Sequence, residues 1–274
     1  MLNNNMNGKT IGIISIKGGV GKTSSVSALG ASLANDYHKK VLVVDANFSA
    51  PTLGMHLGLP RPEVTLHHVL NDQASVKDAI YETNHGFDIL PGALIFEKIN
   101  PFKLAEKIRD LRRKYDVILL DSSPNLNDEV LAVMMASDEL LAVTTPDYIT
   151  LASTLRAIKI AKDRKTPIIG LVLNKVYNKN FEIDLEDIEA FSGCSVLAVL
   201  PHEVNVLESL AKGVPSTLDK NSASGLEYKK LAASLIGESY DEGRIKSFIK
   251  KMTGRVPKQE VNRVIFTGTR KASF

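Results

Sequence analysis

A loop with three glycines and two lysines holds the residues of this chain most able to do chemistry. Residues 16–24 read Ile-Lys-Gly-Gly-Val-Gly-Lys-Thr-Ser, between an apolar run and a helix-compatible stretch. Glycines have no Cβ atom, so consecutive N–H groups can converge on an anion at a helix N-terminus. Lys22 would then contact the β- and γ-phosphates, and the Thr23 hydroxyl would ligate Mg²⁺. The predicted nucleotide-binding residues of the loop are Gly18, Gly19, Val20, Gly21, Lys22, Thr23 and Ser24.

The loop departs from the standard phosphate-binding pattern G-x-x-x-x-G-K-[ST] at its first position. Ile16 stands where that pattern has glycine, and Lys17 follows it. With this second lysine the loop resembles the deviant Walker A motif of the MinD/ParA family of ATPases. In that family the extra lysine contacts the partner's phosphates in a nucleotide-sandwich dimer, which implies ATP and ADP as ligands and a homodimer in the ATP state. A cation at the start of the loop, five residues before Lys22, is badly placed for its own phosphates, which favours the same role in trans for Lys17.

Short β-branched runs alternate with helical stretches along the chain, which is typical of a parallel sheet with crossover helices. Near-continuous apolar runs indicate that both sheet faces are covered. We therefore predict an α/β fold of P-loop NTPase type, with a doubly wound, mostly parallel sheet and helices on both faces. The predicted strands are Thr10–Ile16, Val41–Asp45, Phe87–Leu90, Val117–Asp121, Leu140–Thr144, Ile168–Leu173 and Val196–Leu200. The predicted helices include Lys22–Asn35, Phe102–Lys114, Thr150–Lys162 and Leu207–Lys212.

Ligands in such folds bind beyond the carboxyl ends of the strands, and two of these ends carry acids. Asp121 closes an apolar run and precedes Ser-Ser-Pro, which resembles the Walker B and switch II segment, so its carboxylate is expected to hold Mg²⁺ through water. Asp45 ends the second strand and resembles the start of switch I, and we expect it to organise the metal with Thr23 and Asp121. Family members commonly have a second aspartate two residues later, where this chain has Asn47. An amide can orient the attacking water without a carboxylate's charge, so we predict slow hydrolysis.

A third strand end is predicted to contact the base. Asn174 follows an apolar strand, and Pro201-His202-Glu203 follows the last one. The family resemblance implies that Asn174, Pro201 and Glu203 read the adenine edge. The amide of Asn174 can both donate to a ring nitrogen and accept from the exocyclic amine. Taken alone, Asn-Lys after a strand is a turn signal.

Composition and length fit a compact globular ATPase domain, placed at residues 1–240. The chain has 274 residues, 44% hydrophobic and 24% charged, which suffices for one large core. Apolar runs are too short to cross a bilayer and residues 1–7 are polar, so we expect a cytoplasmic protein. The single cysteine, Cys194, excludes an internal disulfide, a C-x-x-C pair and the paired cysteines of the related iron–sulfur carriers.

The C-terminal tail, residues 241–274, is strongly basic. Residues 244–274 hold nine basic residues and one acid, so this stretch carries +8 and the rest of the chain −5 within a total of +3. Ile245, Phe248, Ile249 and Met252 form an apolar stripe at helical spacing, and basic residues populate the opposite face. This pattern predicts a short amphipathic helix over Arg244–Arg255 that binds an anionic membrane surface, which would resemble MinD proteins. The alternative is a terminal helix docked on the rest of the protein. The sequence assigns no role to residues 257–274.

The resemblance, most similar to archaeal MinD-like members, spans about residues 10–235. It implies an ATPase that dimerises with ATP, associates reversibly with the inner face of the cell membrane, positions division or other machinery, and is stimulated by an activating partner protein. Lys17, Lys22, Asn47 and Asp121 are the predicted catalytic residues. One alternative is a ParA-like DNA-partition ATPase that contacts DNA through the basic residues of 103–114 or through the tail. Another is an ATP-dependent ligase sharing this loop, for which no motif supplies a substrate pocket.

Overall fold

The computed structural model describes residues 8–59, 61–94, 98–240 and 256–271, and the predicted membrane helix at 244–255 lies outside these ranges. An eight-stranded sheet forms the centre of the described molecule, in the order β3-β4-β2-β5-β1-β6-β7-β8. Its strands are β1 Lys9–Ile14, β2 Val41–Ala46, β3 Tyr81–Glu82, β4 Asp88–Leu90, β5 Val117–Ser122, β6 Glu139–Thr144, β7 Ile168–Val176 and β8 Val196–Pro201. All neighbours pair in parallel except β3 and β4, which are antiparallel. The predicted fold class is confirmed.

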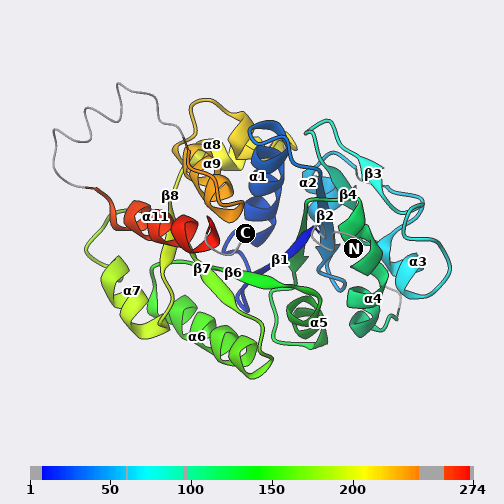
Figure 1. Cartoon of the computed structure of the whole chain (residues 1–274), viewed down its shortest axis with the longest axis horizontal. Coiled ribbons are helices and arrows are strands. Elements are labelled where there is room, and N and C mark those ends of the chain that lie inside the picture. The colour runs from blue at the N-terminus through cyan, green and yellow to red at the C-terminus, as the bar shows by residue number, and fades with distance from the viewer. Residues whose placement is uncertain (1–7, 60, 95–97, 241–255, 272–274) are drawn as a thin grey trace, which may run out of the picture.

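Helices cover both faces of this sheet (Figure 1). They are α1 Lys22–Asn35, α2 Leu53–His56, α3 Leu66–Leu70, α4 Leu104–Ile108, α5 Asp128–Ala136, α6 Tyr148–Asp163, α7 Leu185–Ser192, α8 Val204–Ala211, α9 Ala223–Leu235 and α11 Lys258–Lys271, with 3₁₀ turns η1 Pro101–Lys103, η2 Arg109–Arg113 and η3 Ser216–Leu218. Helices α1 and α9 lie on one face, and α4, α5 and α6 lie on the other. Within the described ranges, no helix combines the length and apolar character needed to span a bilayer.

Alternation along the strands divides the core into two apolar layers. On β1, Ile11 and Ile13 pack with the layer under α1 and α9, whereas Ile14 packs with the layer on the opposite face. All three side chains are at most 1% exposed. Successive strand residues point to opposite faces, so a run that is apolar throughout has to be covered on both sides. This burial fixes the register of β1 and therefore the point at which the glycine-rich loop begins.

Local signals start and stop the helices beside the loop. Asn127 and Asp147 cap α5 and α6 by accepting hydrogen bonds from Val130 N and Thr150 N. The predicted helix Phe102–Lys114 is wrong as one element, because it is divided into η1, α4 and η2. In the last turn, Arg112 Nε donates to the Gly8 carbonyl at 2.8 Å, and Gly8 N donates to the Arg112 carbonyl. Pairing with the segment before β1 therefore competes with continuation of the helix.

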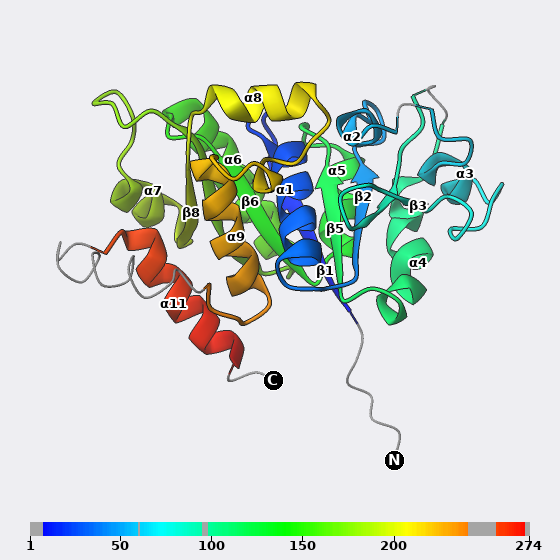
Figure 2. The same cartoon turned by 90° about the horizontal axis from the view of Figure 1, so that it is seen from above.

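Helix α11 docks against the edge strand β8 and helix α9 (Figure 2). Arg263 is 5% exposed and donates to the Leu197 carbonyl and to Glu227, both at 2.8 Å. Asn262 donates to the Val196 carbonyl at 2.8 Å. Side chains of α11 thus bind carbonyl groups of β8, while Val264 and Ile265 on the same helix are 73% and 62% exposed. Residues 258–271, which the sequence left unassigned, form part of the body.

Candidate functional site

The glycine-rich loop joins β1 to α1 at the carboxyl ends of the strands, where the sheet order changes direction around β1 (Figure 2). Gly19 and Gly21 have φ values of 73° and 103°, a region that residues with a Cβ atom rarely adopt. A Cβ atom on Gly21 would also lie 2.2 Å from Asn174 Nδ2. Both backbone conformation and space therefore require glycine at this position, next to Lys22.

Asn174 at the end of β7 holds the loop in place. Its Nδ2 donates to the Val20 carbonyl at 2.7 Å, and its Oδ1 accepts from Lys175 N at 2.8 Å. Asn174 still lines the cavity beside the loop. In this structure, however, the amide that was predicted to read the adenine edge contacts the protein's own backbone.

Thr23 and Asp121 form the polar pair expected of a Mg²⁺ site. The Thr23 hydroxyl donates to Asp121 Oδ2 at 2.6 Å. Asp121 is 1% exposed, and its other oxygen, Oδ1, is buried without a hydrogen-bond partner among the described residues. A buried, unsatisfied carboxylate oxygen is costly unless a ligand completes it. Hydroxyl and carboxylate oxygens are hard donors, so this pair fits Mg²⁺ held together with phosphate and water.

Three buried ionisable groups lie at the base of the loop. Asp45 and Asp121 are register partners on β2 and β5. Burial raises the pKa of Asp121 to about 6. Burial and the neighbouring Asp121 raise the pKa of Asp45, and burial lowers the pKa of Lys22. Burial therefore disfavours the charged forms of all three side chains. A phosphate group near Lys22 and Mg²⁺ near the two aspartates would supply the counter-charges that stabilise them.

The segment after β2 is anchored by Asp45. The carboxylate oxygens of Asp45 accept from Asn47 N at 3.3 Å and from Leu53 N at 3.0 Å. Asn47 Nδ2 donates to the Ala50 carbonyl at 2.5 Å, and Asn47 Oδ1 is buried without a hydrogen-bond partner within the described ranges. Asp45 thus positions the loop that carries Asn47, and the amide oxygen of Asn47 retains its capacity to accept a hydrogen bond.

Lys17 is directed toward α6 rather than toward the site of its own chain. Its Nζ donates to Thr150 Oγ1 at 2.7 Å and lies 3.6 Å from Asp147 Oδ1. Lys22 Nζ, by contrast, lies 3.4 Å from the Lys17 carbonyl oxygen, inside the loop. The two lysines of the motif therefore occupy separate surroundings, one buried and one partly exposed.

The end of β8 forms the far wall of the site. Pro201 is the last residue of β8, and Glu203 begins the approach to α8. The Glu203 carboxylate accepts from Ala223 N at 3.0 Å, Ser224 N at 2.9 Å and the Ser222 hydroxyl at 3.2 Å. Glu203 therefore caps the N-terminus of α9. Burial raises the pKa of Glu203, but these hydrogen bonds together outweigh it and lower the pKa below its usual value. Its carboxylate, like the amide of Asn174, is engaged by the protein itself.

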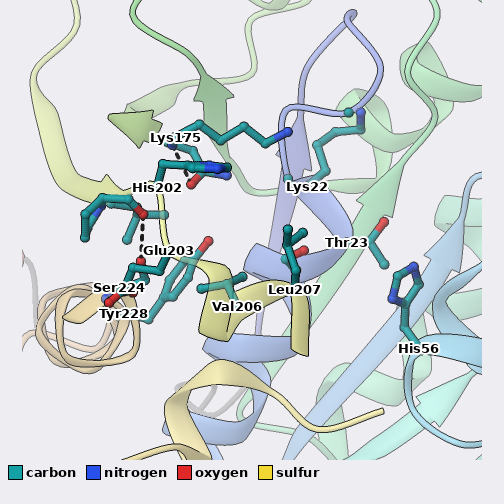
Figure 3. Close-up of a pocket in the computed structure, with 16 residues that line it drawn as sticks. Lys22, Thr23, His56, Lys175, His202, Glu203, Val206, Leu207, Ser224 and Tyr228 are labelled. Atoms are coloured by element: carbon teal, nitrogen blue, oxygen red, sulfur yellow. Dashed lines mark hydrogen bonds between the residues drawn. The ribbon is translucent and has the colours of Figure 1, made fainter. Parts of the chain in front are cut away.

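A cavity of about 380 Å³ joins these elements (Figure 3). Its lining includes Lys22, Thr23, Asn174, Pro201 and Glu203 of the predicted set. The sequence did not identify His56, Lys175, His202, Val206, Leu207 and Tyr228, which also line it. His202 occupies the variable position of the Pro-x-acid motif, and the motif specifies no residue type there, so the sequence pattern does not identify it. Tyr228 lies within α9, where nothing in the local pattern distinguishes it from a core residue, and its hydroxyl is 2.7 Å from Ser25 Oγ.

Comparison with known sequences agrees with this geometry. Residues 8–169 match the AAA domain family. An ATP-binding protein of Methanocaldococcus jannaschii is 32% identical over 256 residues, which cover 89% of this chain and 97% of that protein. The septum site-determining protein MinD of Synechocystis is 29% identical, covering 84% of this chain and 90% of that protein.

Solved structures share both the fold and the length of the domain. The cell division ATPase MinD of Pyrococcus furiosus is 36% identical, with a TM-score of 0.78, covering 82% of this chain and 97% of that one. The Pyrococcus horikoshii protein MinD, solved with Mg-ADP, is 32% identical, with a TM-score of 0.79, covering 83% and 95%. An Aquifex aeolicus MinC:MinD complex is 25% identical, with a TM-score of 0.75, covering 86% and 98%.

Proposed function

This chain belongs to the MinD/ParA family of deviant Walker A ATPases, and on that premise we propose that it binds and hydrolyses Mg-ATP and dimerises in the ATP state. The dimer associates reversibly with the inner face of the cell membrane, and the ADP form returns to the cytoplasm as a monomer. The cycle positions division or other cellular machinery. The observation that carries the nucleotide site is Asp121, with one oxygen on the Thr23 hydroxyl and the other buried without a hydrogen-bond partner among the described residues.

Each residue of the site has a distinct role in hydrolysis. The loop N–H groups and Lys22 bind the phosphates, while Thr23 and Asp121 hold Mg²⁺, which would neutralise charge on the phosphate oxygens. Asp45 fixes the segment after β2 through Asn47 N and Leu53 N. The Asn47 carbonyl oxygen orients the attacking water but has no negative charge with which to polarise it. Because this chain has Asn47 where family members commonly have aspartate, we expect slow basal ATP turnover.

The position of Lys17 supports dimerisation. Its ammonium group contacts Thr150 and Asp147 at the start of α6, whereas the Lys22 ammonium group lies against the loop backbone. Nearby, Tyr148 and Ile149 at the start of α6 are 73% and 74% exposed. A second copy that covered this surface would bury apolar area and bring its own nucleotide close to Lys17. The solved MinC:MinD complex supports the proposal that this family member also binds a partner protein. We propose that such a partner stimulates its ATP hydrolysis.

The basic residues of α4 and its neighbouring turns weaken the DNA-partition alternative. Lys103 and Lys107 both pair with Asp72, the former at 2.6 Å. Arg112 pairs with Asp138 at 2.9 Å, and Lys114 lies 3.8 Å from Asp88. Ion pairs therefore engage four of the six basic residues at 103–114, whereas Arg109 and Arg113 are exposed, so this surface keeps only part of its charge for contacts with DNA phosphates. The amphipathic sequence 244–255 remains the stronger candidate for the surface-binding element.

Co-sedimentation with anionic lipid vesicles and with DNA, each with ATP or ADP, tests the proposal. We expect the protein to sediment with vesicles in ATP and to remain in solution in ADP, because two tails of a dimer bind more tightly than one. Salt should weaken this binding, since the basic face contributes electrostatic attraction. Phe248→Glu should abolish vesicle binding while the ATP dimer persists. Sedimentation of that variant like wild type would reject the tail as the anchor, and ATP-dependent binding to DNA would favour the partition alternative.

A further inference from the structure

The nucleotide cavity has an aromatic wall that none of the assigned motif roles explains. His202 follows β8, and its backbone N donates to the Val176 carbonyl at 2.9 Å. Its ring packs against Tyr177, with 4.5 Å between the centroids and 30° between the planes. Tyr177 in turn lies 6.4 Å from the Phe181 ring, and Tyr177 N donates to the Glu182 carboxylate at 2.8 Å. The His202 and Tyr177 rings, which follow two neighbouring strands, thus pack face to face, and the Phe181 ring lies beyond Tyr177 at an angle of 50° to it.

His202 and Tyr177 line two different hollows that share Gly19 and Lys175 in their linings. His202 lines the cavity of about 380 Å³ that contains Lys22 and Thr23. Tyr177 and Phe181 instead line the neighbouring hollow of about 400 Å³, together with Lys17. One side of the His202 ring is therefore covered by Tyr177, and the ring borders the nucleotide cavity with its remaining surface (Figure 3).

An apolar surface on another element borders the same cavity. Val206 and Leu207 of α8 line it, and Leu207 is 56% exposed. His202 and Leu207 come from different elements but border the space beside Lys22 in Figure 3. A cavity with an aromatic ring, exposed alkyl groups and a phosphate-binding loop suits a flat heteroaromatic group attached to a phosphate chain.

The side chains predicted to read the edge of a base also form hydrogen bonds with the protein's own backbone. The Asn174 amide binds Val20 and Lys175, and the Glu203 carboxylate binds the first residues of α9. Each group keeps further donor or acceptor capacity, so the base can be recognised by its face as well as by its edge. Stacking on an aromatic side chain tolerates different bases, because every base has a π-face, and larger rings offer more contact area.

We propose that His202 is the stacking platform for the purine base of the bound nucleotide, and that Tyr177 positions the His202 ring. This proposal deepens the ATPase function proposed above and rests on it. It assigns the base contact to a residue outside the motif positions. Stacking by itself would favour the larger purine rings over pyrimidines.

Nucleotide titration of the full chain tests this role, with inorganic tripolyphosphate as the probe that lacks a base. We expect His202→Ala to raise the Kd for ATP about 5- to 100-fold, the range that removing a base–aromatic stack produces. The Kd for tripolyphosphate should not change, because the phosphate loop is untouched. His202→Phe should bind ATP nearly like wild type, and Tyr177→Leu should give an intermediate loss. His85→Ala is the matched control, because it removes a histidine that does not line the cavity and whose ring centroid lies 6.2 Å from that of Phe87. It should leave the Kd for ATP unchanged.

Each outcome separates this inference from the proposed function. Unchanged ATP affinity in His202→Ala would overturn the stacking role while leaving the ATPase intact. Equal loss of ATP and tripolyphosphate would show that the residue supports the loop rather than the base. If the wild-type protein bound neither probe, the ATPase proposal itself would fail.

Discussion

At the scale of single residues, the two lysines of the phosphate loop are predicted to have separable effects. Lys17→Ala should retain ATP affinity but lose the ATP-induced dimer, because Lys17 contacts Thr150 and Asp147 rather than the interior of its own loop. Lys22→Ala should lose both, because Lys22 is 7% exposed at the end of the loop and its ammonium group lies 3.4 Å from the Lys17 carbonyl oxygen. Light scattering with a non-hydrolysable ATP analogue measures the dimer. A dimer of undiminished strength in Lys17→Ala would reject the role in trans.

Asn47 is predicted to limit the rate of hydrolysis. Asn47→Asp should raise basal ATP turnover at least about tenfold, because a carboxylate polarises the attacking water more strongly than an amide and general bases contribute roughly 10²–10⁴. Asn47→Ala is the control and should not raise turnover. Steady-state phosphate release is the measurement. Unchanged turnover at unchanged ATP affinity would mean that another group positions the water.

Asp121 is predicted to reduce the stability of the nucleotide-free protein above pH 6. Its folded-state pKa of about 6 exceeds the usual value of 3.8, so the folded state binds the proton more tightly. Stability from this group is fully present below about pH 4 and is lost as the pH rises to 6. Asp121→Asn should therefore stabilise the nucleotide-free protein at pH 8 by about 1–3 kcal/mol, with little difference at pH 4, while losing Mg²⁺-dependent hydrolysis. Urea unfolding at both pH values checks this, and equal effects at both would contradict it.

At the scale of elements, the sequence predicts the buried strands, but it does not predict features that depend on contacts between residues distant in sequence. Helix α1 has the predicted bounds, and the long parallel strands were located because apolar runs have to be covered on both faces. Strand β3 was missed because two residues contain no measurable period. The helix predicted over 102–114 is interrupted where Arg112 contacts Gly8, which is distant in sequence. Pairing of this kind leaves no trace in local propensity.

The site shows the same division between local and distant information. The loop, Thr23 and Asp121 converge because the loop follows β1, Thr23 lies in the first turn of α1, and Asp121 lies near the carboxyl end of β5. That placement follows from the fold class. The use of the Glu203 carboxylate as a cap for α9 depends on a contact with residues about twenty positions later. His202 and Tyr177 meet because β7 and β8 are neighbours. Such roles require knowledge of strand order.

The start of α6 is predicted to be a contact surface for a second copy. Ile149→Glu should weaken the ATP dimer without changing nucleotide affinity, because a carboxylate would replace an exposed apolar side chain beside the Lys17 contact. Val264→Glu, with similar exposure on α11, is the matched control and should leave the dimer intact. Sedimentation velocity with the ATP analogue distinguishes the two. Equal dimerisation by both variants would place the interface elsewhere.

At the scale of the whole molecule, helix α11 packs the last described part of the chain against the edge of the sheet. Arg263→Ala should lower the free energy of unfolding by about 1.5–3 kcal/mol, because it removes charge-assisted hydrogen bonds to Glu227 and to the Leu197 carbonyl. Lys258→Ala removes a more exposed ion pair with Glu189 and should cost at most about 1 kcal/mol. Urea unfolding and amide hydrogen exchange of 258–271 measure both effects. Equal losses would show that Arg263 does not hold the helix.

The docking of α11 also sets the reach of the predicted membrane segment. Residues 241–255 connect Tyr240 to Val256 in the sequence, and both of these flanking residues belong to the described part of the chain, with Val256 just before the docked helix. A free tail of fifteen residues could extend about 50 Å at roughly 3.4 Å per residue. A segment that must return covers about half that distance. Any bilayer it contacts has to lie within about 25 Å of the side of the molecule that carries β8 and α9, so the same attachment that holds the segment also orients the ATPase on the surface.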